Sequence, residues 1–164
     1  MSREIHRLAA EAGAALRDRK LKVATVESCT GGWIAQAMTD IAGSSTWFER
    51  GFVTYSNDAK QELVGVQAQT LAQHGAVSGE VAQQMAIGGI RSSRADVAVS
   101  VTGIAGPDGG SAEKPVGTVW IAWASRDGHS NAVRHRLQGN RRAVRESSVE
   151  QALQGLIRFL ESHE

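Results

Sequence analysis

A serine and a cysteine stand where a predicted buried strand gives way to a glycine-rich turn. Residues 21–26 are apolar and β-branched, and the segment after the turn has helical periodicity. Ser28 and Cys29 therefore lie just beyond a strand end, where either side chain is a candidate nucleophile. The question is which of them, if either, has a base beside it.

The turn that follows is a candidate anion site. Thr30, Gly31 and Gly32 begin the next helix, and unpaired amides at a helix N-terminus carry partial positive charge that suits an oxyanion or a phosphate. The two glycines let a ligand approach the backbone. Helix capping by Ser28 or Thr30, with glycines needed only for packing, explains the same residues.

A serine nucleophile needs a base, and the sequence TYSNDAK offers Lys60 next to Tyr55. The five histidines are scattered without an obvious orienting carboxylate, whereas a lysine kept neutral can activate a serine. If Asn57 caps the helix, Lys60 takes its third position, where the helix dipole disfavours the cation by only ~0.3–1 kcal/mol. Burial has to supply the rest. Tyr55 is then expected to relay a proton or orient the lysine; the alternative is a solvated lysine beside a half-buried tyrosine.

A third loop, VTGIAGPDGG, also follows a predicted strand. Thr102 is expected to donate to a substrate oxygen, and the amides of Gly103, Ala105 and Gly106 to bind carbonyl or phosphate oxygens. The chain contains neither a GxxxxGK[ST] phosphate loop nor a GxGxxG dinucleotide motif. Ligands of open α/β sheets gather at the carboxyl ends of parallel strands. The three loops are therefore predicted to meet in one cleft, although a purely structural loop is the alternative here.

Three arginines begin the predicted C-terminal helix. Arg142 and Arg145 are three residues apart, share a helix face and are predicted to clamp a phosphate; a solvated basic face that also includes Arg141 is the alternative. Nowhere do His, Cys, Asp and Glu show metal-ligand spacing, so no metal is expected.

The elements that must position these residues alternate between strands and helices along most of the chain. One Asp127-Gly128 turn joins two strands as a hairpin and breaks this alternation. Ser78 is expected to cap a helix in which Gly88 and Gly89 require close backbone packing. The fold class is therefore α/β: a single domain, 1–164, with three α/β/α layers around a mixed, mainly parallel sheet that has one antiparallel hairpin.

Composition excludes several classes of protein. The 164 residues are 41% hydrophobic and 21% charged with a formal net charge of +1, which gives no general attraction to nucleic acid or to an anionic membrane. One cysteine allows no internal disulfide, and no apolar run approaches the length of a membrane span. A cytoplasmic protein is expected, with no nucleic-acid or membrane partner.

Four long blocks resemble the CinA C-terminal domain family and together cover nearly the whole chain. They are VESCTGGWIAQAMTDIAGSS, WFERGFVTYSNDAKQELVGV, TLAQHGAVS and GIAGPDGGSAEKPVGTVW. Stand-alone bacterial members of this family are nicotinamide-nucleotide amidohydrolases. They hydrolyse the carboxamide of nicotinamide mononucleotide (NMN) to nicotinic acid mononucleotide and ammonia, which returns a by-product of NAD consumption to NAD synthesis.

The resemblance assigns roles to individual residues. It implies Ser28 as the nucleophile, Lys60 as its base and Tyr55 as the tyrosine beside them, in an α/β/α fold that typically forms a homodimer and uses no metal or organic cofactor. Oxyanion stabilisation is expected from the amides around Thr30 and Gly31.

Three alternatives stay open at this point. Cys29 would be the nucleophile if the helix N-terminus lowered the pKa of its thiol. A non-catalytic module that senses a phosphorylated nucleotide would use the same anion-binding turns. Nucleic-acid binding is third, and it would show a steep salt dependence.

Overall fold

The computed structural model describes residues 2–163, which form a five-stranded mixed sheet with the strand order β2-β1-β3-β4-β5. The strands are β1 (Val23–Glu27), β2 (Phe48–Val53), β3 (Val97–Gly103), β4 (Thr118–Ser125) and β5 (Ser130–Arg136). β1 pairs in parallel with both β2 and β3, whereas β4 is antiparallel to both of its neighbours. Every strand except β4 therefore points the same way, and the carboxyl ends of β2, β1 and β3 lie side by side.

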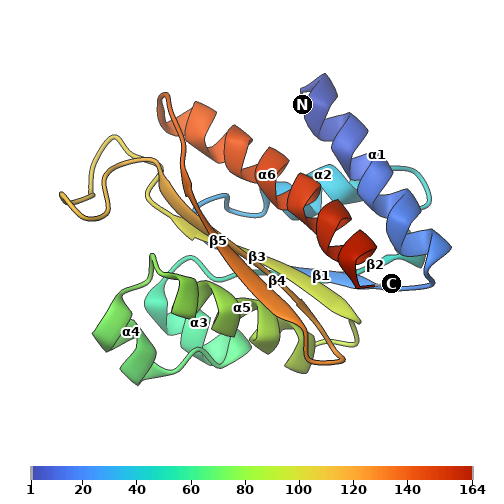
Figure 1. The fold of residues 1–164 in the computed structure, drawn as a ribbon, viewed down its shortest axis with the longest axis horizontal. Helices are drawn as coiled ribbons and strands as arrows, with labels where there is room; N and C mark the ends of the chain where they lie inside the picture. The colour runs from blue at the N-terminus through green and yellow to red at the C-terminus, as the bar shows by residue number, and fades with distance from the viewer. Residues whose placement is uncertain (1, 164) are drawn as a thin grey trace.

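Helices cover both faces of this sheet. They are α1 (Arg3–Asp18), α2 (Trp33–Thr39), α3 (Asn57–Val64), α4 (Ala68–His74), α5 (Gly79–Arg91) and α6 (Arg141–Ser162), with a short 3-10 turn, η1 (Ser44–Thr46). Figure 1 shows α1, α2 and α6 on one face and α3, α4 and α5 on the other. The predicted three-layer α/β fold is confirmed.

The core lies mainly between the sheet and the pair α1 and α6. Ile5, Leu16, Leu153 and Leu156 are fully buried there, as the helical spacing of the apolar residues predicts. β1 is buried along its whole length, because both of its faces are covered by helices. The central strands thus form a rigid base for the loops at their carboxyl ends.

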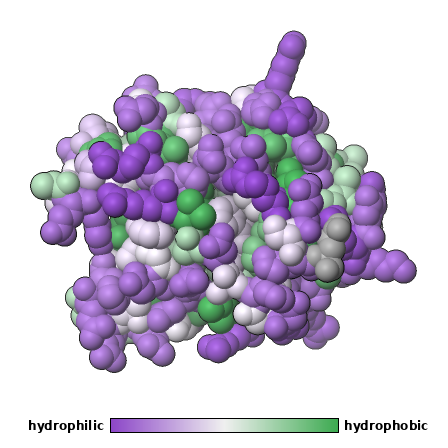
Figure 2. All heavy atoms as spheres, viewed as in Figure 1, coloured by the Kyte–Doolittle hydropathy of each residue, from purple (hydrophilic) through white to green (hydrophobic). Residues whose placement is uncertain are grey.

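The outer strands are more exposed than the centre. All residues of β2 and β5 are half-buried or exposed. The molecular face in Figure 2 is mostly hydrophilic, with hydrophobic side chains in small separate groups. Within the described chain, no helix is both long enough and apolar enough to cross a membrane.

Local expectations are mostly confirmed. Ser78 caps α5 by accepting a hydrogen bond from the amide of Val81. A Cβ atom on Gly88 would lie 1.8 Å from the carbonyl oxygen of Val64, so only glycine lets α3 pack this closely against α5. The expected cap of α3 is wrong: the cap is Ser56, whose hydroxyl accepts from Ala59, and Asn57 is already helical.

Candidate active site

The three predicted loops meet at one cavity of about 250 Å³ beside the carboxyl ends of β1, β2 and β3. Its lining comprises Ser28, Cys29, Tyr55, Asn57, Lys60, Ala76, Val77, Thr102, Gly103, Ala105 and Arg141. Parallel strands bring these loops together because their carboxyl ends share one edge of the sheet. The predicted cleft therefore contains the serine, the lysine and the tyrosine.

Ser28 and Lys60 are in direct contact inside this cavity. The Nζ atom of Lys60 lies 3.1 Å from Oγ of Ser28, and the two side chains are 1% and 8% exposed, respectively. Nζ also donates to the main-chain oxygens of Thr54 at 2.9 Å and Tyr55 at 3.3 Å. Its hydrogen-bond partners are thus two carbonyls and one hydroxyl, with no carboxylate among them.

Burial is the main influence on the pKa of Lys60. Removal from water lowers the pKa of its ammonium group, and the nearby Cys29 opposes this only in part. Because Ser56 caps α3, Lys60 is the fourth helical residue rather than the third, and the helix dipole weakens within the first turn. Desolvation is therefore the main cause of the shift towards neutral lysine.

Tyr55 contributes its main chain to this contact. Its carbonyl oxygen accepts from Lys60 and from the hydroxyl of Ser28, the latter at 3.4 Å. The side chain is 62% exposed, and its hydroxyl lies 3.5 Å from a guanidinium nitrogen of Arg141. Of the two predicted roles of the Tyr55 hydroxyl, orienting the lysine falls to the Tyr55 carbonyl instead, and proton relay stays a prediction.

The turn after Ser28 has a left-handed backbone at both glycines. Gly31 and Gly32 have φ values of +62° and +104°, which side chains rarely tolerate. The amide of Gly31 already donates to the carbonyl of Ser28, so the expected oxyanion contact from Gly31 is not available. Within residues 2–163, the amide of Thr30 has no hydrogen-bond partner and that of Cys29 approaches only its own thiol.

Glu27 is a buried carboxylate to which we assigned no role from the sequence. It is 1% exposed and accepts from the Thr30 hydroxyl at 2.6 Å and from the amides of Ile34 and Ala35 at 2.7 and 3.0 Å. Burial raises the pKa of its carboxyl, and the hydrogen bonds oppose that rise. Glu27 thereby caps α2, whose own cap residue, Gly32, has no side chain to do so.

Cys29 is poorly suited to act as a nucleophile. Its side chain is 7% exposed and belongs to the hydrophobic core, and burial raises the pKa of the thiol to about 12. The lowered thiol pKa expected at a helix start is therefore wrong, because desolvation dominates and α2 begins only at Trp33. At neutral pH the group is a thiol.

The third loop lines the cavity with Thr102, Gly103 and Ala105. The Thr102 hydroxyl donates its one hydrogen to the carbonyl of Ala76 at 2.9 Å, so towards a ligand it can accept a hydrogen bond but not donate one. Gly106 lies outside the lining, and its carbonyl accepts from Arg141 at 2.8 Å.

The arginines divide differently from the prediction. Arg142 and Arg145 both lie over the ring of Trp33, and neither lines the cavity. Arg145 donates to the carbonyls of Cys29 and Thr30, so it holds the turn from its carbonyl side. The cavity instead contains Arg141, the first residue of α6. Arg142 and Arg145 do share a helix face, as predicted, but this face is turned towards Trp33.

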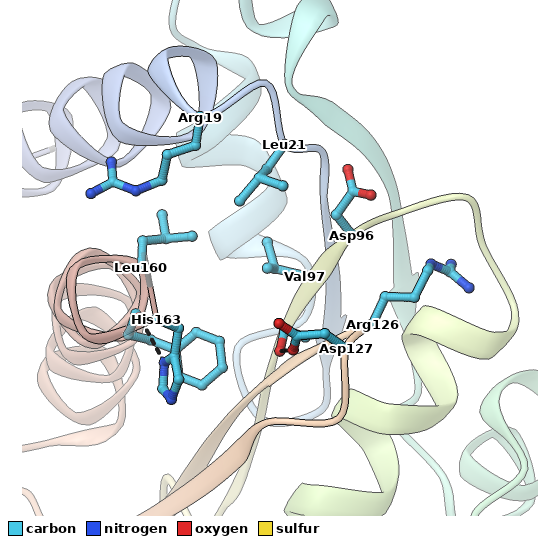
Figure 3. A pocket seen from close by; sticks show the side chains of 10 residues that line it. Arg19, Leu21, Asp96, Val97, Arg126, Asp127, Leu160 and His163 are labelled. Carbon is cyan, nitrogen blue, oxygen red and sulfur yellow. Dashed lines mark hydrogen bonds between the residues drawn. The ribbon is translucent and has the colours of Figure 1, made fainter.

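Other groups that could do chemistry lie away from this cavity. His6, His74 and His129 do pair with carboxylates, but no histidine is among the lining residues. Among the described residues, no three His, Cys, Asp or Glu side chains form a metal-binding group. A second cavity, of about 230 Å³, lies at the amino ends of the parallel strands (Figure 3) and shares no residue with the first.

Comparisons with known proteins agree on the family. The model of the CinA C-terminal domain matches residues 5–160. The nicotinamide-nucleotide amidohydrolase PncC of Escherichia coli K12 is 58% identical over 93% of both chains, and PncC of Pseudomonas putida is 50% identical over 93% of this chain and 94% of its own. The crystal structure of the competence/damage inducible protein CihA from Agrobacterium tumefaciens matches with a TM-score of 0.94 and 48% identity over 98% of both chains. The chain therefore belongs to the CinA C-terminal domain family.

Proposed function

We propose that the chain hydrolyses the carboxamide of NMN to nicotinic acid mononucleotide and ammonia, with Ser28 as nucleophile and Lys60 as base. The contact between Nζ of Lys60 and Oγ of Ser28 inside the cavity is the observation that carries this proposal. The names of the PncC relatives support the substrate, and their identity covers nearly the whole chain.

The partners of Lys60 include no carboxylate and accommodate a neutral amine. A neutral amine has two hydrogens and one lone pair, and Nζ faces two carbonyls and one hydroxyl. The hydrogens then point at the oxygens of Thr54 and Tyr55, and the lone pair accepts the Ser28 proton once the serine hydroxyl turns from the Tyr55 carbonyl towards Nζ. Burial favours this uncharged state.

The reaction then proceeds in two balanced halves. Lys60 takes the Ser28 proton while Oγ bonds to the carboxamide carbon, and the oxyanion accepts from the amides of Cys29 and Thr30. The C–N bond breaks, Lys60 returns the proton to the leaving nitrogen, and ammonia departs from an acyl-enzyme. Water attacks this ester as Lys60 takes one of its protons, and that proton goes to Oγ of Ser28 as the carboxylic acid leaves and then loses its own proton to solvent.

Recognition of the nucleotide is assigned to the cavity wall. With Lys60 neutral, Arg141 is the cation among the lining residues, and it can bind the phosphate with Tyr55 beside it. Thr102 accepts from the carboxamide NH₂, which is a donor that an acid product lacks. The same proposal includes action as a cytoplasmic homodimer without metal or organic cofactor.

The test is ammonia release from NMN by the parent and by Ser28→Ala, with free nicotinamide as a second substrate. We expect turnover of NMN by the parent only, and far less turnover of nicotinamide, which has no phosphate. A parent that binds NMN without releasing ammonia would contradict the enzyme proposal and favour a nucleotide-sensing module.

A further inference from the structure

Glu27 is a buried charged group that the proposed reaction leaves without a role. It precedes Ser28 directly, yet it does not line the cavity. Burying a carboxylate costs free energy unless hydrogen bonds compensate it. Glu27 is compensated by accepting three hydrogen bonds, from Thr30, Ile34 and Ala35. Its role therefore depends on what these bonds hold in place.

These bonds close the turn on itself. Glu27 is the last residue of β1, and its acceptors reach across the turn to the first residues of α2. Strand, turn and helix are thereby tied together by one side chain. The ends of the turn cannot separate without leaving a buried carboxylate unpaired.

Arg145 grips the same turn from the other side. Its guanidinium donates to the carbonyls of Cys29 and Thr30, while Glu27 accepts from the hydroxyl of Thr30 and from helix amides. The carbonyls of the turn are thus engaged by a cation, and the helix amides by an anion. What remains without an outside partner is the pair of amides at Cys29 and Thr30, next to the Ser28 hydroxyl.

From this arrangement we propose that Glu27 is a positioning residue for the acyl transfer, holding the turn so that Ser28 and the Cys29 and Thr30 amides keep their reactive geometry. The inference rests on the proposed function for its kinetic consequence. Glu27 differs from an ordinary core residue because all three of these donors lie in the turn after Ser28 or in the first residues of α2.

The test compares Glu27→Gln with the parent by ammonia release from NMN and by amide hydrogen exchange. Glutamine keeps the volume of the side chain, but its NH₂ group replaces one of the two accepting oxygens. This NH₂ group can only donate, so it cannot bind the N–H and O–H groups that Glu27 binds. We expect kcat to fall about 10- to 100-fold, as for a disturbed oxyanion site, with KM within about threefold. Exchange should accelerate in residues 28–35 but not in α1.

Two variants make the result decisive if Glu27→Gln folds poorly. Thr30→Val removes only the hydroxyl donor and should lower kcat by a smaller factor with KM unchanged. Ser2→Ala removes the cap of α1, which accepts from Ile5 far from the cavity, and should leave kcat unchanged.

Each outcome decides the inference. An unchanged kcat in Glu27→Gln, or a loss accompanied by faster exchange throughout the sheet, overturns the positioning role. If the parent itself releases no ammonia from NMN, the proposed function fails. Amide hydrogen exchange then still tests whether Glu27 stabilises the turn. Unchanged protection of residues 28–35 in Glu27→Gln and Thr30→Val would show that it does not.

Discussion

The two ends of the parallel strands both border a cavity, but their polar groups differ in contact with water. At the carboxyl ends, Glu27, Ser28 and Lys60 are almost fully buried. At the amino ends, shown in Figure 3, Asp127 and His163 are exposed above an apolar floor. Because burying polar groups costs free energy, their concentration at one end supports the proposal that the reactive site lies there.

The pKa values of Asp127 and Lys60 are both lowered, with opposite consequences for the charge of the two groups. Asp127 accepts from Ser125 and His129, which lowers the pKa of its carboxyl to about 2 and keeps it charged. Lys60 lies in a buried environment that lowers its pKa towards the neutral form. Hydrogen bonding at a surface thus stabilises an ordinary ion, whereas burial at the other end favours the neutral amine that the proposed base requires.

The largest predicted effect comes from removing that base. Lys60→Met keeps the length and the burial of the side chain but has no proton acceptor, so ammonia release from NMN should fall by at least about 10³-fold. The matched change at the other end, Asp127→Asn, should leave the rate unchanged. Comparable losses in both variants would remove the distinction between the two ends.

A smaller effect is expected for the cation at the cavity wall. Arg141→Gln removes a charged partner for the phosphate and should raise KM for NMN about 10- to 100-fold, since hydrogen bonds to charged groups contribute ~1.5–3 kcal/mol. Arg142→Gln, one residue further along α6, is the control because Arg142 lies over Trp33. Steady-state kinetics of the two variants measure this, and an equal KM in both would contradict the assignment to Arg141.

The smallest effect is predicted for the other nucleophile candidate. Cys29→Ala should retain turnover within about threefold, because a thiol with a pKa near 12 supplies almost no thiolate at neutral pH. Thiol alkylation of the folded parent should be correspondingly slow. Loss of turnover in Cys29→Ala with the fold intact would reopen the cysteine hypothesis.

The sequence was sufficient for the α/β fold, and it indicated that three strand ends would meet. Strand and helix periodicity reflect burial directly. Ser28 follows β1, Thr102 lies at the end of β3, and Lys60 lies in the first turn of α3. Their convergence followed from the shared direction of parallel strands. The residues alone left Lys60 open as the base for Ser28 or as a solvated lysine, and the family resemblance favoured the base.

Side-chain direction at the helix start could not be predicted. Arg141, Arg142 and Arg145 are identical in type, and which one enters the cavity depends on where α6 crosses the sheet. The roles of Thr54 and Tyr55 towards Lys60 are main-chain contacts, which leave no trace in residue type. Glu27 was visible in the motif, but its cap reaches across the turn, unlike the usual short-range capping pattern.

The most direct test of a neutral Lys60 is an NMR titration of its side-chain amine in the parent, with Lys60→Met identifying the resonance. Lowered pKa means that the ammonium loses its proton at lower pH than a solvated lysine, whose pKa is about 10.4. We predict a midpoint below that of the other lysines, and an acidic limb of kcat/KM at the same pH. A Lys60 that titrates together with the solvated lysines would contradict its role as the base for Ser28.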